Sequence, residues 1–199
     1  MPGGPSLSAV AAAEQATFRA LLSAMARPST VVHLAHRRPE DGAWASALVV
    51  LQSLLDHEVT FSVLTADGYP REQLLRRTGS RITEVETADF ILAAGDAAEE
   101  AIRRAKDGDL EYPDASATVV LSCDTVGGGP LRLLLAGPGV NGTATLAVGG
   151  VGAAAFENLR ERNVAFPLGV DVILAGQDGN AACIPRSTRI DNIGMSTEH

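Results

Sequence analysis

The stretch DFILAAGDAAEEAIRRAKDG, residues 89–108, decides the fold class of this chain. Its first part is apolar at successive positions rather than alternate ones, which is typical of a strand buried on both faces of a parallel or mixed sheet. Asp96 is then expected to cap a helix in which acidic residues precede Arg103 and Arg104, a spacing that favours ion pairs on a solvated face. A buried strand followed by such a helix indicates an α/β protein.

Apolar strands and amphipathic helices continue to alternate on both sides of this stretch. The pattern predicts a single-domain, three-layer α/β sandwich with a mixed sheet over residues 1–199, with frayed ends at residues 1–7 and 192–199. Ser46 is a predicted N-cap, and GGGP at 127–130 is a predicted turn. The other expected elements are helices at 8–27, 46–56, 69–79 and 154–163, and strands at 30–34, 59–64, 117–123, 131–140, 143–148, 169–176 and 180–184.

Composition narrows the classes of function. The formal net charge is −8 and no block of Lys or Arg occurs, which disfavours nucleic-acid binding. The two cysteines, Cys123 and Cys183, lie in apolar runs and are interpreted as buried thiols of a reducing compartment. We find neither a signal-peptide pattern nor a run of about 20 apolar residues, so we expect a cytoplasmic protein that does not span a membrane.

The stretch GVDVILAGQDGNAACIPRST predicts a β-hairpin near the C-terminus. Asp178-Gly179 is typical of a two-residue turn with positive φ at both positions. Pro185 cannot donate to a ladder, so it should end the second strand. Arg186 follows directly, and two roles remain open for it: a structural ion pair or carbonyl contact, or the binding of an anion.

Glycine clusters supply the other candidate for anion binding. Gly149, Gly150 and Gly152 precede a predicted helix, whose first backbone N–H groups could cradle a phosphate. Neither a phosphate-binding loop ending in Gly-Lys-Ser/Thr nor the dinucleotide fingerprint is present. Tight turns or close helix packing explain the same glycines, and both interpretations stay open. If these glycines bind an anion, the chain is expected to be an autonomous nucleotide- or phosphonate-binding enzyme.

No catalytic or metal-ligating set emerges from the remaining residues. His33 and His36 should point to opposite faces of a strand, and no spacing typical of a metal site occurs. Ser122 next to Asp124 is not a triad without a placed base. The single lysine, Lys106, ends a solvated helix, which is a poor place for the Schiff base of a pyridoxal-phosphate (PLP) enzyme. We therefore expect no catalytic residue, no metal and no cofactor.

Three segments, in order, resemble the PhnH family of the bacterial carbon–phosphorus (C–P) lyase system. They are FRALLSAMARPS at 18–29, LRLLLAGPGV at 131–140, and the hairpin region with FPLGVDVIL and IPRST. The resemblance covers essentially the whole chain. It implies a fold like the large domain of PLP-dependent transferases, without the PLP site.

The resemblance also implies a role in phosphonate catabolism. In that system PhnG, PhnH, PhnI and PhnL form ribose 1-phosphonate 5-triphosphate from ATP and a phosphonate, with the chemistry placed on PhnI. PhnJ later cleaves the C–P bond. The expected function is therefore a non-catalytic subunit of this transferase complex, with PhnG, PhnI and PhnJ as partners. A homodimer is a further expectation for the isolated chain, because a partner surface can pair with itself.

Overall fold

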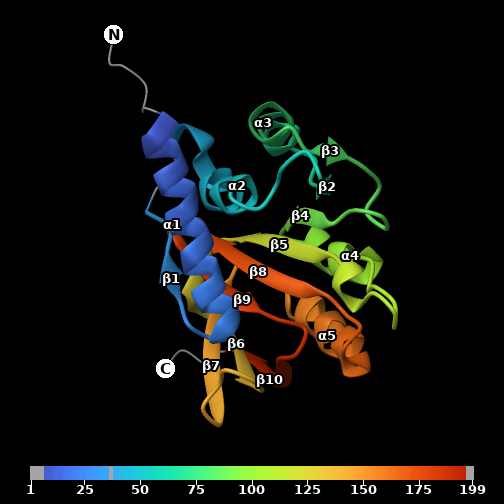
Figure 1. The fold of residues 1–199 in the computed structure, drawn as a ribbon. Coiled ribbons are helices and arrows are strands. Elements are labelled where there is room, and N and C mark those ends of the chain that lie inside the picture. Colours follow the sequence, from blue (N-terminus) through green and yellow to red (C-terminus); the bar gives the residue numbers. More distant parts are fainter. Residues whose placement is uncertain (1–6, 36–37, 196–199) are drawn as a thin grey trace.

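A seven-stranded mixed sheet forms the centre of the molecule (Figure 1). The computed structural model describes residues 7–35 and 38–195. In spatial order the strands are β1 (Val32–His33), β9 (Asn180–Ile184), β8 (Asp171–Gly176), β5 (Thr118–Cys123), β4 (Phe90–Ala94), β2 (Thr60–Leu64) and β3 (Arg81–Ile82). The five strands from β8 to β3 run parallel, whereas β9 pairs antiparallel with β8, and β1 in turn pairs antiparallel with β9. The carboxyl ends of the parallel strands therefore share one edge of the sheet.

The apolar runs of the central strands are buried on both faces, as the sequence predicts. Successive residues of β4, β5 and β8 point alternately into two cores because side chains alternate across a strand. One core includes Ile91, Val119 and Val172 with residues of α4 (Ala97–Arg104) and α5 (Ala153–Arg162). The other includes Leu92, Val120 and Ile173 with residues of α1 (Leu7–Ala26), α2 (Ala45–Gln52) and α3 (Tyr69–Thr78).

A second sheet was not predicted. It has three antiparallel strands in the order β10 (Arg189–Met195), β6 (Thr125–Ala136) and β7 (Thr143–Gly149). Its apolar side chains join the core that α4 and α5 share. The α/β fold with a mixed sheet is thus confirmed, and the layer that holds α4 and α5 also holds this small sheet.

Two local predictions fail in this second sheet. The GGGP segment is not a turn, because it lies inside the continuous strand β6 as an irregularity at which Val126 and Leu131 both face Val148. Gly129 adopts φ 102°, and a Cβ there would lie 2.5 Å from the Gly149 nitrogen, so the backbones approach too closely for a side chain. Residues 192–195, expected to be frayed, pair with β6 as part of β10, and residues 196–199 lie outside the described range.

The C-terminal hairpin is confirmed, but its turn differs from the expected one. Gly179 has φ 89°, whereas Asp178 does not adopt a positive φ. The Gly179 N–H donates to the Gly176 carbonyl at 2.9 Å, which closes a four-residue turn before the left-handed glycine. Ser46 is not an N-cap either, since it lies inside α2 and its Oγ donates to the same Gly176 carbonyl at 2.5 Å.

The capping expectation at α4 is met only in position. Asp96 occupies the N-cap site, but its side chain forms no capping hydrogen bond.

Within the described residues, no helix is both long enough and apolar enough to cross a membrane.

Candidate functional site

The carboxyl edge of the parallel strands is the first place to look for a site. The chain leaves β2 outward through α3 to β3, and it leaves β4 in the other direction through α4 to β5. The strand order therefore reverses between β2 and β4. Open α/β sheets bind ligands outside the carboxyl ends of their strands at such a reversal.

Three carboxylates follow strand ends at this edge. Asp67, Asp96 and Asp124 come shortly after the carboxyl ends of β2, β4 and β5, respectively. Acidic residues at these strand ends make the potential of the edge more negative, which disfavours phosphates and phosphonates. The described residues contain no group of three or more His, Cys, Asp or Glu side chains placed to hold a metal ion.

A short segment also covers this edge. The 3-10 segment η1 (Pro39–Trp44) runs into α2, and the Trp44 indole N–H donates to Asp67 at 2.7 Å. Asp67 in turn accepts the Tyr69 backbone N–H at 2.9 Å, at the start of α3. With Ser46 bonded to the Gly176 carbonyl, the segment that includes η1 is fastened to the ends of β2 and β8. The place of a conventional ligand is thus crossed by the chain itself.

A buried ion pair holds η1 against α3. The Asp41 carboxylate has no exposed surface and accepts two hydrogen bonds from the Arg77 guanidinium, each 2.8 Å long. The Tyr69 hydroxyl donates to the same carboxylate at 2.8 Å. Burial alone would raise the pKa of Asp41, but the hydrogen bonds from Arg77 and Tyr69 bring it below its usual value. Asp41, Arg77 and Tyr69 satisfy one another's hydrogen-bonding groups. The cluster therefore holds η1 against α3 and is not a reactive centre.

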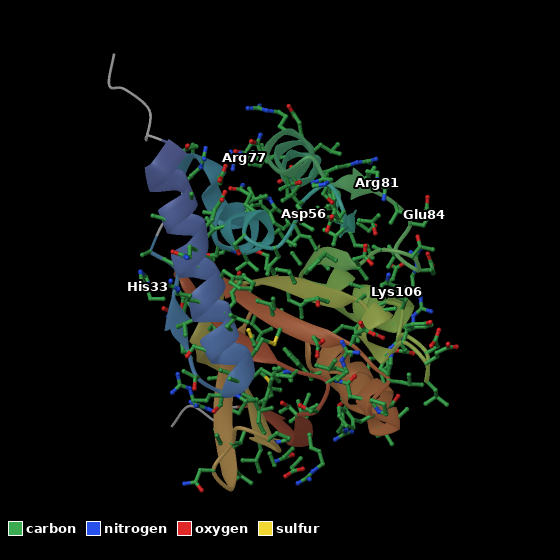
Figure 2. The ribbon with its side chains drawn as sticks, viewed as in Figure 1. His33, Asp56, Arg77, Arg81, Glu84 and Lys106 are labelled. Atoms are coloured by element: carbon green, nitrogen blue, oxygen red, sulfur yellow. The ribbon has the colours of Figure 1, made fainter. Side chains whose placement is uncertain are left out.

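Sequence analysis missed this cluster. Asp41 and Arg77 are 36 positions apart. Nothing in the motif around either residue signals the other. Figure 2 shows Arg77 beside α2 and α3, on another side of the view from Lys106.

The predicted glycine loop lies next to the acidic edge. A Cβ on Gly150, which has φ 84°, would lie 2.6 Å from Cγ of Asp124, and one on Gly149 would lie 2.7 Å from Oγ1 of Thr125. Gly152 is the N-cap of α5, and because it has no side chain it makes no capping hydrogen bond. Close packing therefore accounts for Gly149 and Gly150. A carboxylate stands against the loop where a bound anion would need positive charge.

Arg186 lies at the opposite edge, where the parallel strands begin. Its Nη2 is 2.5 Å from Oδ2 of Asp171, the first residue of β8, and its Nη1 donates to the Pro113 carbonyl at 2.5 Å. The Arg186 backbone N–H also donates to Asp171, at 2.7 Å. The structural role left open by the sequence is the one observed, and the guanidinium is occupied by these partners.

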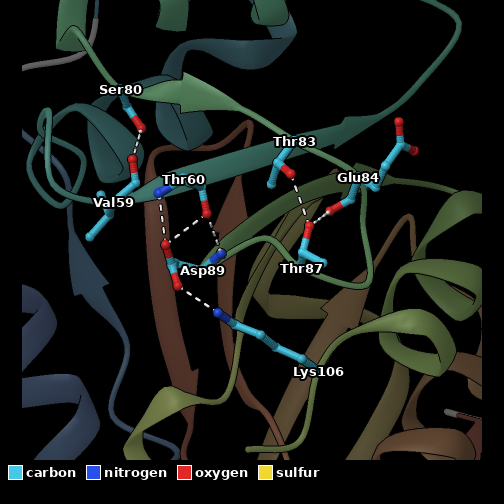
Figure 3. Close-up of polar contacts among 8 residues, drawn as sticks. All are labelled: Val59, Thr60, Ser80, Thr83, Glu84, Thr87, Asp89 and Lys106. Atoms are coloured by element: carbon cyan, nitrogen blue, oxygen red, sulfur yellow. Dashed lines mark hydrogen bonds and ion pairs between the residues drawn. The ribbon is translucent and has the colours of Figure 1, made fainter.

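Lys106 lies at the same amino edge (Figure 3). Its Nζ donates to Oδ1 of Asp89 at 2.6 Å. The other carboxylate oxygen of Asp89 accepts the backbone N–H of Thr60 at 2.8 Å and its hydroxyl at 2.7 Å. Burial opposes ionisation of Asp89, but the Lys106 and Thr60 hydrogen bonds lower its pKa overall. The lysine thus joins α4 to the starts of β2 and β4, on the edge away from the usual ligand position.

The remaining candidate side chains do not come together. His33 is exposed at the margin of the molecule, with Nδ1 3.3 Å from Oδ1 of Asn180, and Figure 2 shows it away from Arg77 and Lys106. His36 and His199 fall outside the described residues. Burial raises the pKa of the Cys123 and Cys183 thiols to about 12, so both are poor nucleophiles at neutral pH.

Comparison with known proteins gives a consistent result. "Putative C-P lyase subunit protein HtxG" of Stutzerimonas stutzeri is 38% identical over 182 residues, which cover 89% of this chain and 86% of that protein. "Alpha-D-ribose 1-methylphosphonate 5-triphosphate synthase subunit PhnH" of Rhizobium meliloti (strain 1021) is 28% identical over 182 residues, 89% of this chain and 90% of that protein. The family model described as "Bacterial phosphonate metabolism protein (PhnH)" matches residues 5–191. This chain therefore belongs to the PhnH family of bacterial phosphonate metabolism proteins.

Proposed function

We propose that this chain is a subunit of the C–P lyase core complex in organic phosphonate catabolism. It supports the formation of ribose 1-phosphonate 5-triphosphate from ATP and a phosphonate, together with PhnG, PhnI and PhnJ. The observation that carries this proposal is the similarity to HtxG, which extends over 86% of that protein rather than over one motif.

We further propose that the subunit is not itself catalytic. The usual ligand edge is crossed by η1, which bonds to Asp67, and Asp124 stands next to the glycine loop. At the other edge the cations Lys106 and Arg186 are each neutralised by an aspartate. A nucleoside triphosphate or a phosphonate needs several free donors or cations to overcome its own solvation. Neither Lys106 nor Arg186 is left as a free cation for such a ligand.

Several finer proposals accompany this one. The fold is related to the large domain of PLP-dependent transferases but holds no PLP, because Lys106 is engaged by Asp89. The chain acts in the cytoplasm, with protein subunits rather than nucleic acid or membrane as its partners, and it forms a homodimer only when those subunits are absent. The acidic net charge of −8 supports the exclusion of nucleic acid.

Co-expression tests the subunit role. The tagged chain should co-elute with PhnG, PhnI and PhnJ in size-exclusion chromatography. A strain lacking its gene should not grow on a phosphonate as the sole phosphorus source until the gene is restored. Independent elution of the chain together with unimpaired growth of the deletion strain would contradict the proposal. Saturable binding of ATP by the isolated chain would contradict the non-catalytic role alone.

A further inference from the structure

Two loops lie side by side at the amino edge of the sheet. One, residues 107–113, follows α4, and the other, residues 163–167, follows α5. Asp107 joins them, since its carboxylate accepts the Arg162 Nε–H at 3.0 Å and its carbonyl accepts the Gly169 N–H at 3.2 Å. Because the second loop lies between Arg162 and Gly169, both loops project from one shared base.

These loops expose large apolar side chains. Leu110 is 79% exposed and Tyr112 is 57% exposed in the first loop, while Val164 is 81% and Phe166 61% exposed in the second. Monomeric proteins rarely keep several such side chains together in water without a function for them. The apolar stripe on α1, formed by Phe18 and Leu22, is less exposed, at 42% and 52%.

Polar bonds hold the apolar residues outward. In the first loop, the Asp109 carboxylate accepts the backbone N–H groups of Glu111 and Tyr112 at 2.9 and 2.7 Å. In the second, the Asn163 side chain accepts the Val170 N–H at 2.9 Å and donates to the Val170 carbonyl at 3.1 Å. The loops are therefore organised before any partner binds, which reduces the entropy lost on association.

The charges around these loops indicate what kind of surface fits them. Asp109, Glu111 and Asp114 are exposed, and none of them takes part in an ion pair among the described residues. Arg162 and Arg186, which both bond to the first loop, are already neutralised by Asp107 and Asp171. Arg160 stands two positions earlier, on nearly the opposite side of α5. A second copy of this surface would bring like charges together, whereas a basic surface would complement it.

We propose that Leu110, Tyr112, Val164 and Phe166 form a docking surface, here called the two-loop surface, for a different protein subunit. The partner presents an apolar patch bordered by Arg or Lys side chains. This proposal rests on the proposed function, because it assigns a place on this chain to the contact that a subunit must make.

Single substitutions within the co-expressed complex test the two-loop surface. Leu110→Asp and Val164→Asp each place a charge in the centre of the interface, and we expect each to weaken association with the PhnG–PhnI–PhnJ assembly roughly 30-fold or more. Leu75→Asp is the matched control, because Leu75 is a 43% exposed leucine on α3, in the other core layer. That control should co-elute as the unchanged chain does. Thermal unfolding of each isolated variant establishes that it is folded.

A charge variant tests the chemistry of the partner without disturbing packing. Glu111→Lys combined with Asp114→Lys should slow association several-fold at low salt, and the difference should shrink as salt screens the charges. Faster association of this variant would overturn the basic character assigned to the partner.

The outcomes separate the two proposals. If the unchanged chain does not co-elute with PhnG, PhnI and PhnJ, the proposed function fails. If it co-elutes and Leu110→Asp and Val164→Asp do so equally well, the two-loop surface is wrong and the function stands. If these variants instead abolish only a homodimer of the isolated chain, the occupant is a second copy and the proposal is overturned.

Discussion

The two edges of the parallel sheet differ in how they use charge. At the carboxyl edge, Asp67, Asp96 and Asp124 follow three strand ends, and η1 is bonded to Asp67 through Trp44 and to α3 through the Asp41–Arg77 ion pair. At the amino edge, three cations are each paired with an aspartate: Lys106 with Asp89, Arg162 with Asp107 and Arg186 with Asp171. The carboxylates disfavour an anionic ligand at the first edge, and none of these three cations is left unpaired at the second.

This contrast explains why a fold that commonly binds ligands shows no reactive centre in the part described here. The fold supplies a crevice position at the carboxyl edge. In this chain η1 crosses that position, and the residues beside it are carboxylates rather than hydrogen-bond donors. The amino edge, where such folds seldom bind ligands, carries the ion pairs that support the exposed apolar loops. This contrast supports the proposal that the chain contacts other protein subunits rather than a small molecule.

The largest expected effect comes from the ion pair at the carboxyl edge. Asp41→Asn keeps an acceptor for Tyr69 but leaves the mostly buried Arg77 guanidinium without a counter-charge. We expect a loss of about 3 kcal/mol in the free energy of unfolding, measured with urea. Asp96→Asn at the same edge is the matched control and should change stability by less than about 0.5 kcal/mol. Equal losses of unfolding free energy in the two variants would contradict the structural role assigned to Asp41.

Acid should weaken the same fastening. The pKa of Asp41 is lower in the folded chain than its unfolded value of about 3.9. Its stabilisation is therefore complete above that value and is lost as the pH falls through the folded pKa. The difference in unfolding free energy between the unchanged chain and Asp41→Asn should be constant near neutral pH and shrink below about pH 4. A difference that grows on acidification would contradict this assignment.

At the amino edge the cost of removing a cation should be smaller. Lys106 and Asp89 are 26% and 36% exposed, so solvent compensates part of the loss. We expect Lys106→Met to reduce the free energy of unfolding by about 1 kcal/mol. Borohydride reduction of the unchanged chain with PLP should leave no label on Lys106, because its Nζ is held against Asp89 by a 2.6 Å hydrogen bond. Specific labelling at Lys106 would revive a cofactor role.

The smallest effect concerns the thiols. Cys123 ends β5 at the carboxyl edge and Cys183 lies in β9, and both are buried with pKa values raised to about 12. A thiol-reactive disulfide reagent should modify neither cysteine in the folded chain and both after denaturation. Rapid modification of Cys123 alone would show that the carboxyl edge opens in solution.

Local sequence patterns predicted the central part of the fold well. The runs ending at Ala94 and Cys123 are continuous and apolar, and only burial on both faces of a sheet makes such runs stable. Helices α3 and α5 also fall where periodicity places them. The patterns failed where partners are distant. The GGGP segment has the composition of a turn, but backbone contact with Val148 and Gly149 keeps it within β6.

The candidate site was less accessible to sequence reasoning. Arg186 could be recognised as a candidate cation, yet its neutralisation by Asp171 depends on how β8 and the segment after β9 meet in space. That Asp67, Asp96 and Asp124 share one edge depends on the parallel pairing of β2, β4 and β5. Neither relation leaves a short-range signal, because the residues that create it are far apart in the chain.

The sequence by itself determined the α/β class, the buried central strands and membership of the PhnH family, since these depend on local periodicity and on residue identities in order. Only the tertiary structure decided which charges neutralise one another, which edge of the sheet is closed, and that Leu110 and Val164 stand exposed on two loops that share one base. Those properties arise from contacts between distant segments. Hydrophobic burial brings the segments together, but the strand register and the loop bonds fix which residues meet.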